Sequence, residues 1–369
     1  MPENVEVRRF SGVDDNAAHS PNEPAYAPGA SRYRNAPAAV SRKFLSRRSY
    51  GAIDLGTNNC RLLIARPTQD SFAVIDAFSR IVRLGEGLST TGRLSDAAID
   101  RSIEALSVCA DKLRRRHVSL ARSVATEACR RAANARHFIR RVHDETGIAL
   151  DIIAPAEEAR LAVLGCHILL EPGEGPALIF DIGGGSTELV LIEPGARGDG
   201  SGEPEIISWY SAPWGVVSLA EKEFNDLTSH EDRMNTYNRM RARVAQSFAD
   251  FASTLPTIGY QPRLLGTSGT VTTLASVHLD LPNYDRNKVD GLILPATEMR
   301  AVSQMLAHKS VPERAEIPCI GRERADLVVA GCAILEAILD IWPAERIGIA
   351  DRGIREGILR SMMARDGHL

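Results

Sequence analysis

The chain of 369 residues is 44% hydrophobic and 25% charged, which is typical of a folded globular protein with room for two domains. Its formal net charge of -3 gives no reason to expect binding to nucleic acid or to an anionic membrane. No apolar run approaches the roughly eighteen residues of a membrane span, and the N-terminus lacks the apolar core of a secretion signal. The six cysteines show no metal-ligand spacing, so we expect reduced core thiols in a cytoplasmic protein.

Residues 1–48 are rich in Pro, Ala, Asn, Ser and Arg and show no apolar periodicity. This composition predicts a disordered N-terminal tail. The end of the tail is basic and contains no acid. A solvated tail explains that charge, and the alternative is an arm that gathers a polyanionic substrate or an anionic partner. The basic residues are Arg32, Arg34, Arg42, Lys43, Arg47 and Arg48.

Strands alternate with helices over residues 49–168, which predicts a first α/β domain. It begins with a strand from Tyr50, a glycine-containing turn and a return strand. The first long helix is expected from Ser95 to Arg115, with Ser95 as its N-cap and apolar residues every three to four positions. The other predicted elements are strands over 71–76, 119–126 and 149–153, a loop over 84–88, and helices over 132–146 and from 157 to about 170.

Residues 169–369 are predicted to form a second α/β domain, which opens with a break rich in Pro and Gly over 172–176. A strand, a turn and a return strand follow, as in the first domain. The last third is expected to be mainly helical. The predicted elements are strands over 177–180, 188–192, 205–211, 263–266 and 347–350, a glycine-rich loop over 194–203, a helix over 229–254 and a turn over 267–270.

The two halves contain the same motif, an Asp at the end of a strand followed by a turn of Gly and small polar residues. Asp54 carries it in the first half, and Asp181 carries it 127 positions later. Such turns leave backbone N–H groups free for phosphate oxygens, beside a carboxylate that can position a divalent cation. The repetition predicts two phosphate clamps facing each other across a cleft. The turn residues are Gly56, Thr57, Asn58, Gly183, Gly184, Gly185, Ser186 and Thr187.

A third turn of small residues follows an apolar strand and precedes a helical run. A helix N-terminus there would offer unpaired N–H groups and a partial positive charge, which suits another phosphate or a nucleotide. Simple capping of the helix by Ser268 or Thr270 is the alternative. The candidate residues of this turn are Gly266, Ser268, Gly269 and Thr270.

Phosphoryl transfer to water requires a base or a water-positioning group and neutralisation of the phosphate oxygens. Glu158, at the start of a predicted helix, is a candidate base, although the helix dipole alone also favours an acid there. Arg130 lies at another strand-to-helix junction, where it could pair phosphate oxygens or be a surface arginine. Glu188 follows the second clamp and is either a metal or water partner or a solvated strand residue.

Together these motifs resemble those of the exopolyphosphatase and guanosine pentaphosphate phosphohydrolase (Ppx/GppA) family, within the actin, sugar-kinase and Hsp70-like superfamily. The resemblance covers about residues 50–360. It implies two actin-like (ribonuclease H-like) α/β domains on either side of a central cleft, in the short two-domain form. The segments that carry it are 54–58, 126–134, 157–160, 181–188, 266–270 and 351–357.

The resemblance also implies an activity, which is hydrolysis of the terminal phosphate of inorganic polyphosphate with Mg²⁺ and a water nucleophile. By position, Glu158 is similar to the family's catalytic base and Arg130 to its phosphate-orienting arginine. Asp54 and Asp181 match metal-binding carboxylates, and Glu188 matches a carboxylate beside the metal and the water. A homodimer is implied as well.

Three other functions remain open at this point. The same chemistry could convert pppGpp to ppGpp, a reaction of the stringent response, and no guanine pocket is recognisable that would decide between the substrates. A kinase of the same superfamily is disfavoured by the Glu158 segment. A non-catalytic protein that binds ppGpp or polyphosphate and signals to a partner is disfavoured by the intact Asp54, Glu158 and Asp181.

Overall fold

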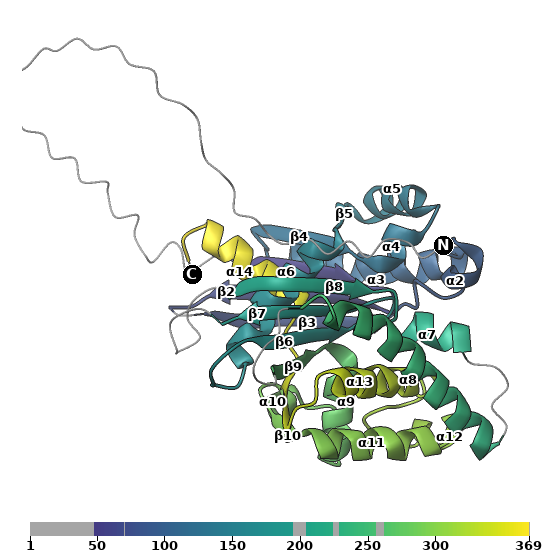
Figure 1. The fold of residues 1–369 in the computed structure, drawn as a ribbon. Coiled ribbons are helices and arrows are strands. Elements are labelled where there is room, and N and C mark those ends of the chain that lie inside the picture. The colour runs from purple at the N-terminus through teal and green to yellow at the C-terminus, as the bar shows by residue number, and fades with distance from the viewer. Residues whose placement is uncertain (1–47, 70, 195–203, 224–228, 256–261, 369) are drawn as a thin grey trace, which may run out of the picture.

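The computed structural model describes residues 48–69, 71–194, 204–223, 229–255 and 262–368 (Figure 1). All of the expected N-terminal tail except Arg48, and most of the glycine-rich loop at 194–203, lie outside the described residues. Within the described part of the chain, no helix has both the length and the apolar character needed to cross a membrane.

The first half is built on a five-stranded sheet with the order β3-β2-β1-β4-β5. The strands β1, β2 and β3 form an antiparallel meander, and β4 and β5 extend the sheet in parallel with β1. The elements are β1 (Tyr50–Leu55), β2 (Asn59–Pro67), β3 (Phe72–Ile81), α2 (Leu88–Thr91), α3 (Asp96–Arg115), β4 (Leu120–Ala125), α4 (Glu127–Arg131), α5 (Ala135–Thr146), β5 (Leu150–Ile152), α6 (Pro155–Cys166) and the 3₁₀-helix η1 (His167–Leu169).

The second half repeats this topology in a six-stranded sheet with the order β10-β11-β9-β6-β7-β8. Here β6, β7 and β8 form the meander, β9 and β11 extend it in parallel, and β10 adds an antiparallel edge. The elements are β6 (Ala177–Ile182), β7 (Thr187–Glu193), β8 (Glu205–Ala212), α7 (Val216–Glu223), α8 (His230–Ala252), β9 (Arg263–Thr267), α9 (Ser268–His278), α10 (Arg286–Val289), β10 (Ile293–Pro295), α11 (Ala296–His308), α12 (Val311–Ala315), α13 (Val328–Ile341), β11 (Arg346–Ala350) and α14 (Ile354–Arg365).

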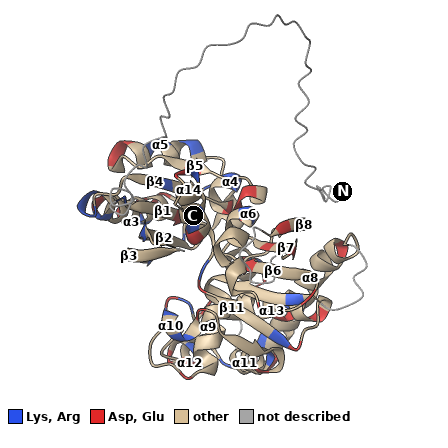
Figure 2. Ribbon diagram, turned by 90° about the vertical axis from the view of Figure 1, so that its left-hand side faces the viewer, with Lys and Arg blue, Asp and Glu red and all other residues tan. Residues whose placement is uncertain are grey.

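The predicted α/β architecture of two related halves is therefore confirmed. Figure 2 shows the halves one above the other, with β1–β4, α3 and α5 in the upper part and β11 with α9–α13 in the lower. The Ser95 hydroxyl accepts a hydrogen bond from the Ala98 amide at 3.2 Å, as the predicted N-cap requires. Strand β3 runs to Ile81 rather than ending at residue 76, because β2 pairs with it along its whole length.

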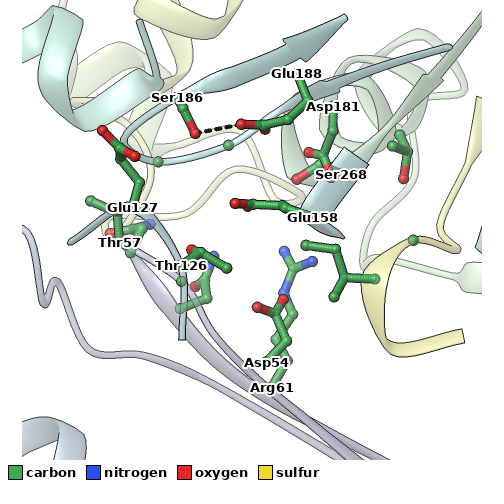
Figure 3. Close-up of a pocket in the computed structure, with 18 of the residues that line it drawn as sticks. Asp54, Thr57, Arg61, Thr126, Glu127, Glu158, Asp181, Ser186, Glu188 and Ser268 are labelled. Atoms are coloured by element: carbon green, nitrogen blue, oxygen red, sulfur yellow. Dashed lines mark hydrogen bonds between the residues drawn. The ribbon is translucent and has the colours of Figure 1, made fainter. Parts of the chain in front are cut away.

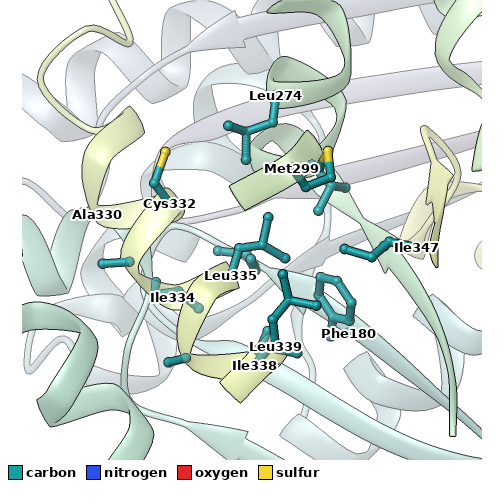
Figure 4. Close-up of a cluster of buried hydrophobic side chains, with 14 of the residues drawn as sticks. Phe180, Leu274, Met299, Ala330, Cys332, Ile334, Leu335, Ile338, Leu339 and Ile347 are labelled. Atoms are coloured by element: carbon teal, nitrogen blue, oxygen red, sulfur yellow. The ribbon is translucent and has the colours of Figure 1, made fainter. Parts of the chain in front are cut away.

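The largest core lies between the second sheet and the helices α8, α9, α11 and α13. All twelve residues from Val328 to Leu339 in α13 are buried, and a helix that is apolar on every side belongs inside a domain. Figure 4 shows Leu335 and Leu339 of this helix close to Phe180 of β6 and Ile347 of β11. This packing fixes the sheet whose strand ends carry the second turn.

The C-terminal helix α14 departs from the predicted division at 168/169, because it packs on the first sheet. Ile358 and Leu359 share one buried cluster with Tyr50 of β1 and Leu63 of β2. Glycine allows α14 to lie directly on α6, since a Cβ at Gly357 would be 2.0 Å from the Leu161 carbonyl oxygen. The two halves are thus connected through a close α6–α14 crossing.

Candidate active site

A cleft between the two halves collects the predicted motifs (Figure 3). It encloses about 710 Å³ of space that is partly open to solvent. Its walls come from both hairpin turns, from the start of α6 and α9, and from the segment before α14. The sequence-predicted residues that line it are Asp54, Gly56, Thr57, Asn58, Glu158, Asp181, Gly183, Gly184, Gly185, Ser186, Glu188 and Ser268.

The two hairpin turns have the same backbone geometry. In the first, the Gly56 amide donates to the Asn59 carbonyl at 2.9 Å, and in the second the Gly183 amide donates to the Ser186 carbonyl at 3.0 Å. The turns also touch each other, since a Cβ at Gly185 would lie 2.6 Å from the Thr57 Oγ1. Glycine at this position is therefore required by the approach of the two halves.

Asp54 and Asp181 occupy equivalent places, each one residue before the end of its strand. Burial raises the pKa of both carboxyl groups, and the Asp54 charge helps to raise the pKa of Asp181 to about 6, while the nearby Arg61 opposes both shifts. The Asp54 Oδ1 is buried without a hydrogen-bond partner. Two facing carboxylates and an unpaired buried oxygen fit a divalent cation.

Glu188 and Glu158 add two more acids to the same space. The Glu188 Oε1 accepts hydrogen bonds from the hydroxyls of Ser186 and Ser211, both at 2.8 Å. Burial and the Asp181 charge raise the pKa of Glu188 to about 7. Glu158 is 6% exposed, and Figure 3 shows it between Asp54 and the Asp181–Glu188 side of the cleft. Burial and the Glu188 charge raise its pKa well above the usual range.

Arg130 and Glu158 meet because α4 and α6 follow the parallel neighbours β4 and β5, whose carboxyl ends share one sheet edge. The Arg130 Nη1 donates to the Glu158 Oε2 at 2.7 Å and to the Ile153 carbonyl at 2.9 Å, and its Nε donates to the Glu127 Oε2 at 3.0 Å. Arg130 is not among the residues that line the cleft. In the structure its guanidinium donates hydrogen bonds to the carboxylates of Glu127 and Glu158.

Two of the predicted phosphate-binding residues are packed inside the protein and do not reach the cleft. The Thr187 hydroxyl donates to the Trp214 carbonyl at 2.6 Å, and the residue is fully buried. Gly266 lies inside β9, where a Cβ would be 2.6 Å from the Phe180 ring. The local sequence of a turn alone cannot show that these two positions face the protein interior.

The third turn is divided between two cavities. Gly269 and Thr270 line a neighbouring cavity with Arg61 and Arg324, so only Ser268 of the four predicted residues reaches the cleft. Helix α9 begins without a side-chain cap, so the capping alternative is not seen. Ser268 has a φ of 80°, which is costly for a residue with a side chain, and its side chain opposes the rise in the pKa of Asp181.

Several lining residues were not predicted as part of the site. Arg61 pairs directly with Asp54 across β1 and β2, so cross-strand register was the signal that could have found it. The others come from the first turn, from the end of β9 and from the starts of α4 and α14. The additional lining residues are Asn59, Arg61, Thr126, Glu127, Thr267, Asp351, Arg352, Gly353, Ile354 and Arg355.

The cleft as a whole is lined by six carboxylates and three guanidinium groups. A phosphate chain therefore meets an excess of negative charge unless a cation is present. Among the described residues, no group of three or more His, Cys, Asp or Glu side chains forms a metal site on its own. Mg²⁺ needs no such group, because it usually binds one or two carboxylates together with water and substrate phosphates.

Known proteins with similar sequences identify the family of the chain. The Ppx/GppA phosphatase family matches residues 63–366. The chain is 31% identical over 317 residues to a putative exopolyphosphatase of Haemophilus influenzae, covering 85% of this chain and 91% of that one. It is 30% identical over 324 residues to exopolyphosphatase 2 of Mycobacterium tuberculosis, covering 84% and 97%.

A solved structure gives the same result for the fold. A Ppx/GppA family member from Aquifex aeolicus matches with a TM-score of 0.68 and 28% identity, over 87% of this chain and 99% of that one. The repeated topology is therefore the two-domain, actin-like arrangement of those proteins. Since both the family match and the fold extend over most of the described chain, the protein belongs to the Ppx/GppA phosphatase family.

Proposed function

We propose that the protein is a Mg²⁺-dependent, cytoplasmic exopolyphosphatase that removes the terminal phosphate of inorganic polyphosphate. The observation that carries this proposal is the meeting of two matched turns with a buried glutamate, Glu158, in one cleft. The names of the relatives in Haemophilus influenzae and Mycobacterium tuberculosis support polyphosphate as the substrate.

Asp54 and Asp181 are the residues that would hold Mg²⁺. Their carboxylates face the same space and one buried oxygen of Asp54 is unpaired, so the donor set fits the ion. When bound, the ion supplies positive charge to the phosphate oxygens.

Glu158 is the proposed general base for the attacking water. Arg130 binds its Oε2 at 2.7 Å, which leaves the Oε1 to accept the proton of a water molecule in the cleft. The raised pKa of Glu158 suits this role, because a base works best when its pKa lies close to the working pH. In this proposal Arg130 orients Glu158 and does not bind phosphate.

The amides of the two turns, the N-terminus of α9 and the guanidinium groups of Arg61 and Arg355 are the proposed phosphate ligands. They approach the cleft from different elements, so a phosphate chain can be held at several oxygens at once. Holding the terminal phosphorus near Glu158 replaces a bimolecular encounter with a positioned attack.

A panel of substrates tests the proposal. Phosphate release is measured from short and long polyphosphate, pppGpp and ATP, with Mg²⁺ and with EDTA, for the wild type and for Glu158→Gln. We expect Mg²⁺-dependent release from polyphosphate by the wild type and little by the variant. Release that is confined to another substrate, or none at all, would reject the assignment.

Hydrolysis of pppGpp to ppGpp is the second candidate. The neighbouring cavity favours it, because Ile182, Val216 and Leu327 give that cavity apolar walls beside Arg61 and Arg324. Such walls suit a planar base. The same panel separates the two substrates, and any turnover excludes a non-catalytic binding protein. The proposed homodimer is tested separately by light scattering of the purified protein.

A further inference from the structure

Glu127 contacts Arg130 on the side of the guanidinium that faces away from Glu158. It is the first residue of α4, one helical turn before Arg130. Its Oε2 accepts from the Arg130 Nε at 3.0 Å and lies 2.9 Å from Nη2. The opposite nitrogen, Nη1, donates to Glu158 at 2.7 Å. One arginine, with 14% of its side chain exposed, therefore bridges two carboxylates that both line the cleft.

We propose that Glu127 is a positioning residue that holds Arg130 in a one-point contact with Glu158; this rests on the proposed function of the cleft. A guanidinium pairs most strongly with a carboxylate through two parallel hydrogen bonds. Glu127 holds the Nε side of the guanidinium, and Glu158 is contacted by Nη1 alone, since the buried Nη2 makes no hydrogen bond. The Glu158 Oε1 consequently stays free for water.

The charges support the same role. When Glu158 accepts a proton from water it becomes neutral, and Arg130, whose side chain is 14% exposed, would then lose one of its two carboxylate partners. A buried cation without a partner is costly. The negative charge of Glu127 still neutralises Arg130 during this step. Arg130 therefore keeps its position when Glu158 is protonated.

Packing fixes Glu127 itself. A Cβ at Gly185 would lie 2.9 Å from the Glu127 Cγ, so the side chain rests against the second hairpin turn. The carboxylate that positions Arg130 comes from the first half of the molecule, and its neighbour comes from the second half. The position of Glu158 is thus linked to the approach of the two turns.

A double-mutant cycle tests the inference with Glu127→Gln, Arg130→Gln and the double variant. Glu127→Gln is expected to lower kcat about tenfold, the size of one lost charge-assisted hydrogen bond, with little change in KM for the wild type's substrate. In the Arg130→Gln background the same substitution should cost little more, because Glu127 acts through Arg130. An equal loss in both backgrounds would overturn the inference, since Glu127 would then act on substrate or cation directly.

Glu157→Gln is the matched control. Glu157 is the neighbour of Glu158 in sequence, yet it pairs with Arg122 and Arg160 instead. Its substitution should leave kcat unchanged. If Glu127→Gln does not fold, Glu127→Asp replaces it in the cycle, because it keeps the charge but shortens the reach to Arg130.

Urea unfolding of the same four proteins adds a readout that needs no substrate. Glu127→Gln should lower the urea concentration at the unfolding midpoint when it is introduced into the wild type. The same substitution should lower that midpoint much less when it is introduced into Arg130→Gln. Equal shifts would deny the contact and with it the inference. Wild-type phosphate release is measured first and tests the proposed function by itself. If the wild type turns over substrate but the effects of the two substitutions simply add, only the role of Glu127 is rejected. If no substrate is turned over, the proposed function and the role of Glu127 are both rejected.

Discussion

Neighbouring glutamates at the start of α6 have opposite environments. Glu157 forms ion pairs with Arg122 and Arg160 and is partly exposed, which is the behaviour expected of an acid in a first helical turn. Glu158 is buried in the cleft with Arg130. A buried acid among other acids costs stability, so its retention indicates a chemical role rather than a contribution to folding.

Replacing Glu158 by Gln keeps the shape of the side chain and removes the proposed base. We expect turnover to fall by about 10²- to 10⁴-fold, the usual contribution of general base catalysis. Circular dichroism should show an unchanged fold. Phosphate release at saturating substrate is the measurement, and release close to that of the wild type would assign the base elsewhere.

Asp181→Asn removes one of the proposed Mg²⁺ ligands and also part of the repulsion within the cleft. Burial and Asp54 raise the pKa of Asp181 to about 6, so its ionisation destabilises the folded state increasingly as pH rises from about 4 to above 6. In EDTA the variant should therefore melt higher than the wild type at pH 7.5, with the difference gone near pH 4.

The Mg²⁺ response gives a second measurement on the same variant. The Mg²⁺ concentration needed for half-maximal activity should rise, because one carboxylate ligand is missing. Added Mg²⁺ should also raise the melting temperature of the wild type more than that of Asp181→Asn. Identical metal titrations for the two proteins would exclude Asp181 as a ligand.

At the scale of elements, the strands around the two turns could be predicted because an apolar strand, a glycine turn and a second strand form a local pattern. The packing of α14 could not. Its partner α6 lies nearly 200 residues earlier in the chain, and their contact depends on glycines that read as ordinary helix residues. Glu127 was missed for a similar reason, since an acid in a first helical turn has a sufficient local explanation.

The structure gives a second explanation for the glycines of the second turn. The motif predicts them as part of a phosphate clamp, whereas in the structure Gly184 and Gly185 also approach the first turn. A Cβ at Gly184 would be 3.0 Å from the Thr57 Cβ. Contact between turns 127 positions apart is a property of the folded pair of domains, so neither motif could reveal it alone.

Gly357→Ala tests the α6–α14 crossing. The added methyl group would lie 2.0 Å from the Leu161 carbonyl oxygen, so the helices must separate. We expect a loss of about 1–3 kcal/mol in the free energy of unfolding, which is typical of an overpacked contact. Gly173→Ala is the control, because its nearest neighbour is a side-chain atom of Arg263 at 3.0 Å and not the backbone of a packed helix. Equal unfolding midpoints in urea for both variants would contradict the close crossing.

For the molecule as a whole, the two halves are also joined away from that crossing. Arg83, which precedes α2, forms an ion pair with Asp326 at 3.1 Å and donates to the Glu323 carbonyl at 3.1 Å. Glu221 of α7 accepts from the Gly87 amide at 2.7 Å. In Figure 1 α2 and α7 lie on the right and α14 on the left, so the polar bridges and the α6–α14 crossing join the two halves at opposite sides of the view.

Asp326→Asn weakens one of these bridges without touching the cleft. Both partners are about one-third exposed, so the pair contributes at most about 1 kcal/mol and is screened by salt. If closure assists binding, the KM for polyphosphate should rise by up to about fivefold with kcat nearly unchanged. The KM of the variant should also depend less on salt than that of the wild type.

The control is Asp100→Asn, which breaks a somewhat more exposed ion pair with Arg141 inside the first half. Because that pair joins α3 to α5 and crosses no domain boundary, it should alter neither KM nor its salt dependence. Small-angle scattering adds a direct measure, since a weakened bridge should increase the radius of gyration in Asp326→Asn alone. Matching KM values for the wild type, Asp326→Asn and Asp100→Asn would mean that the polar bridges do not contribute to closure. The touching turns and the α6–α14 crossing would then determine it.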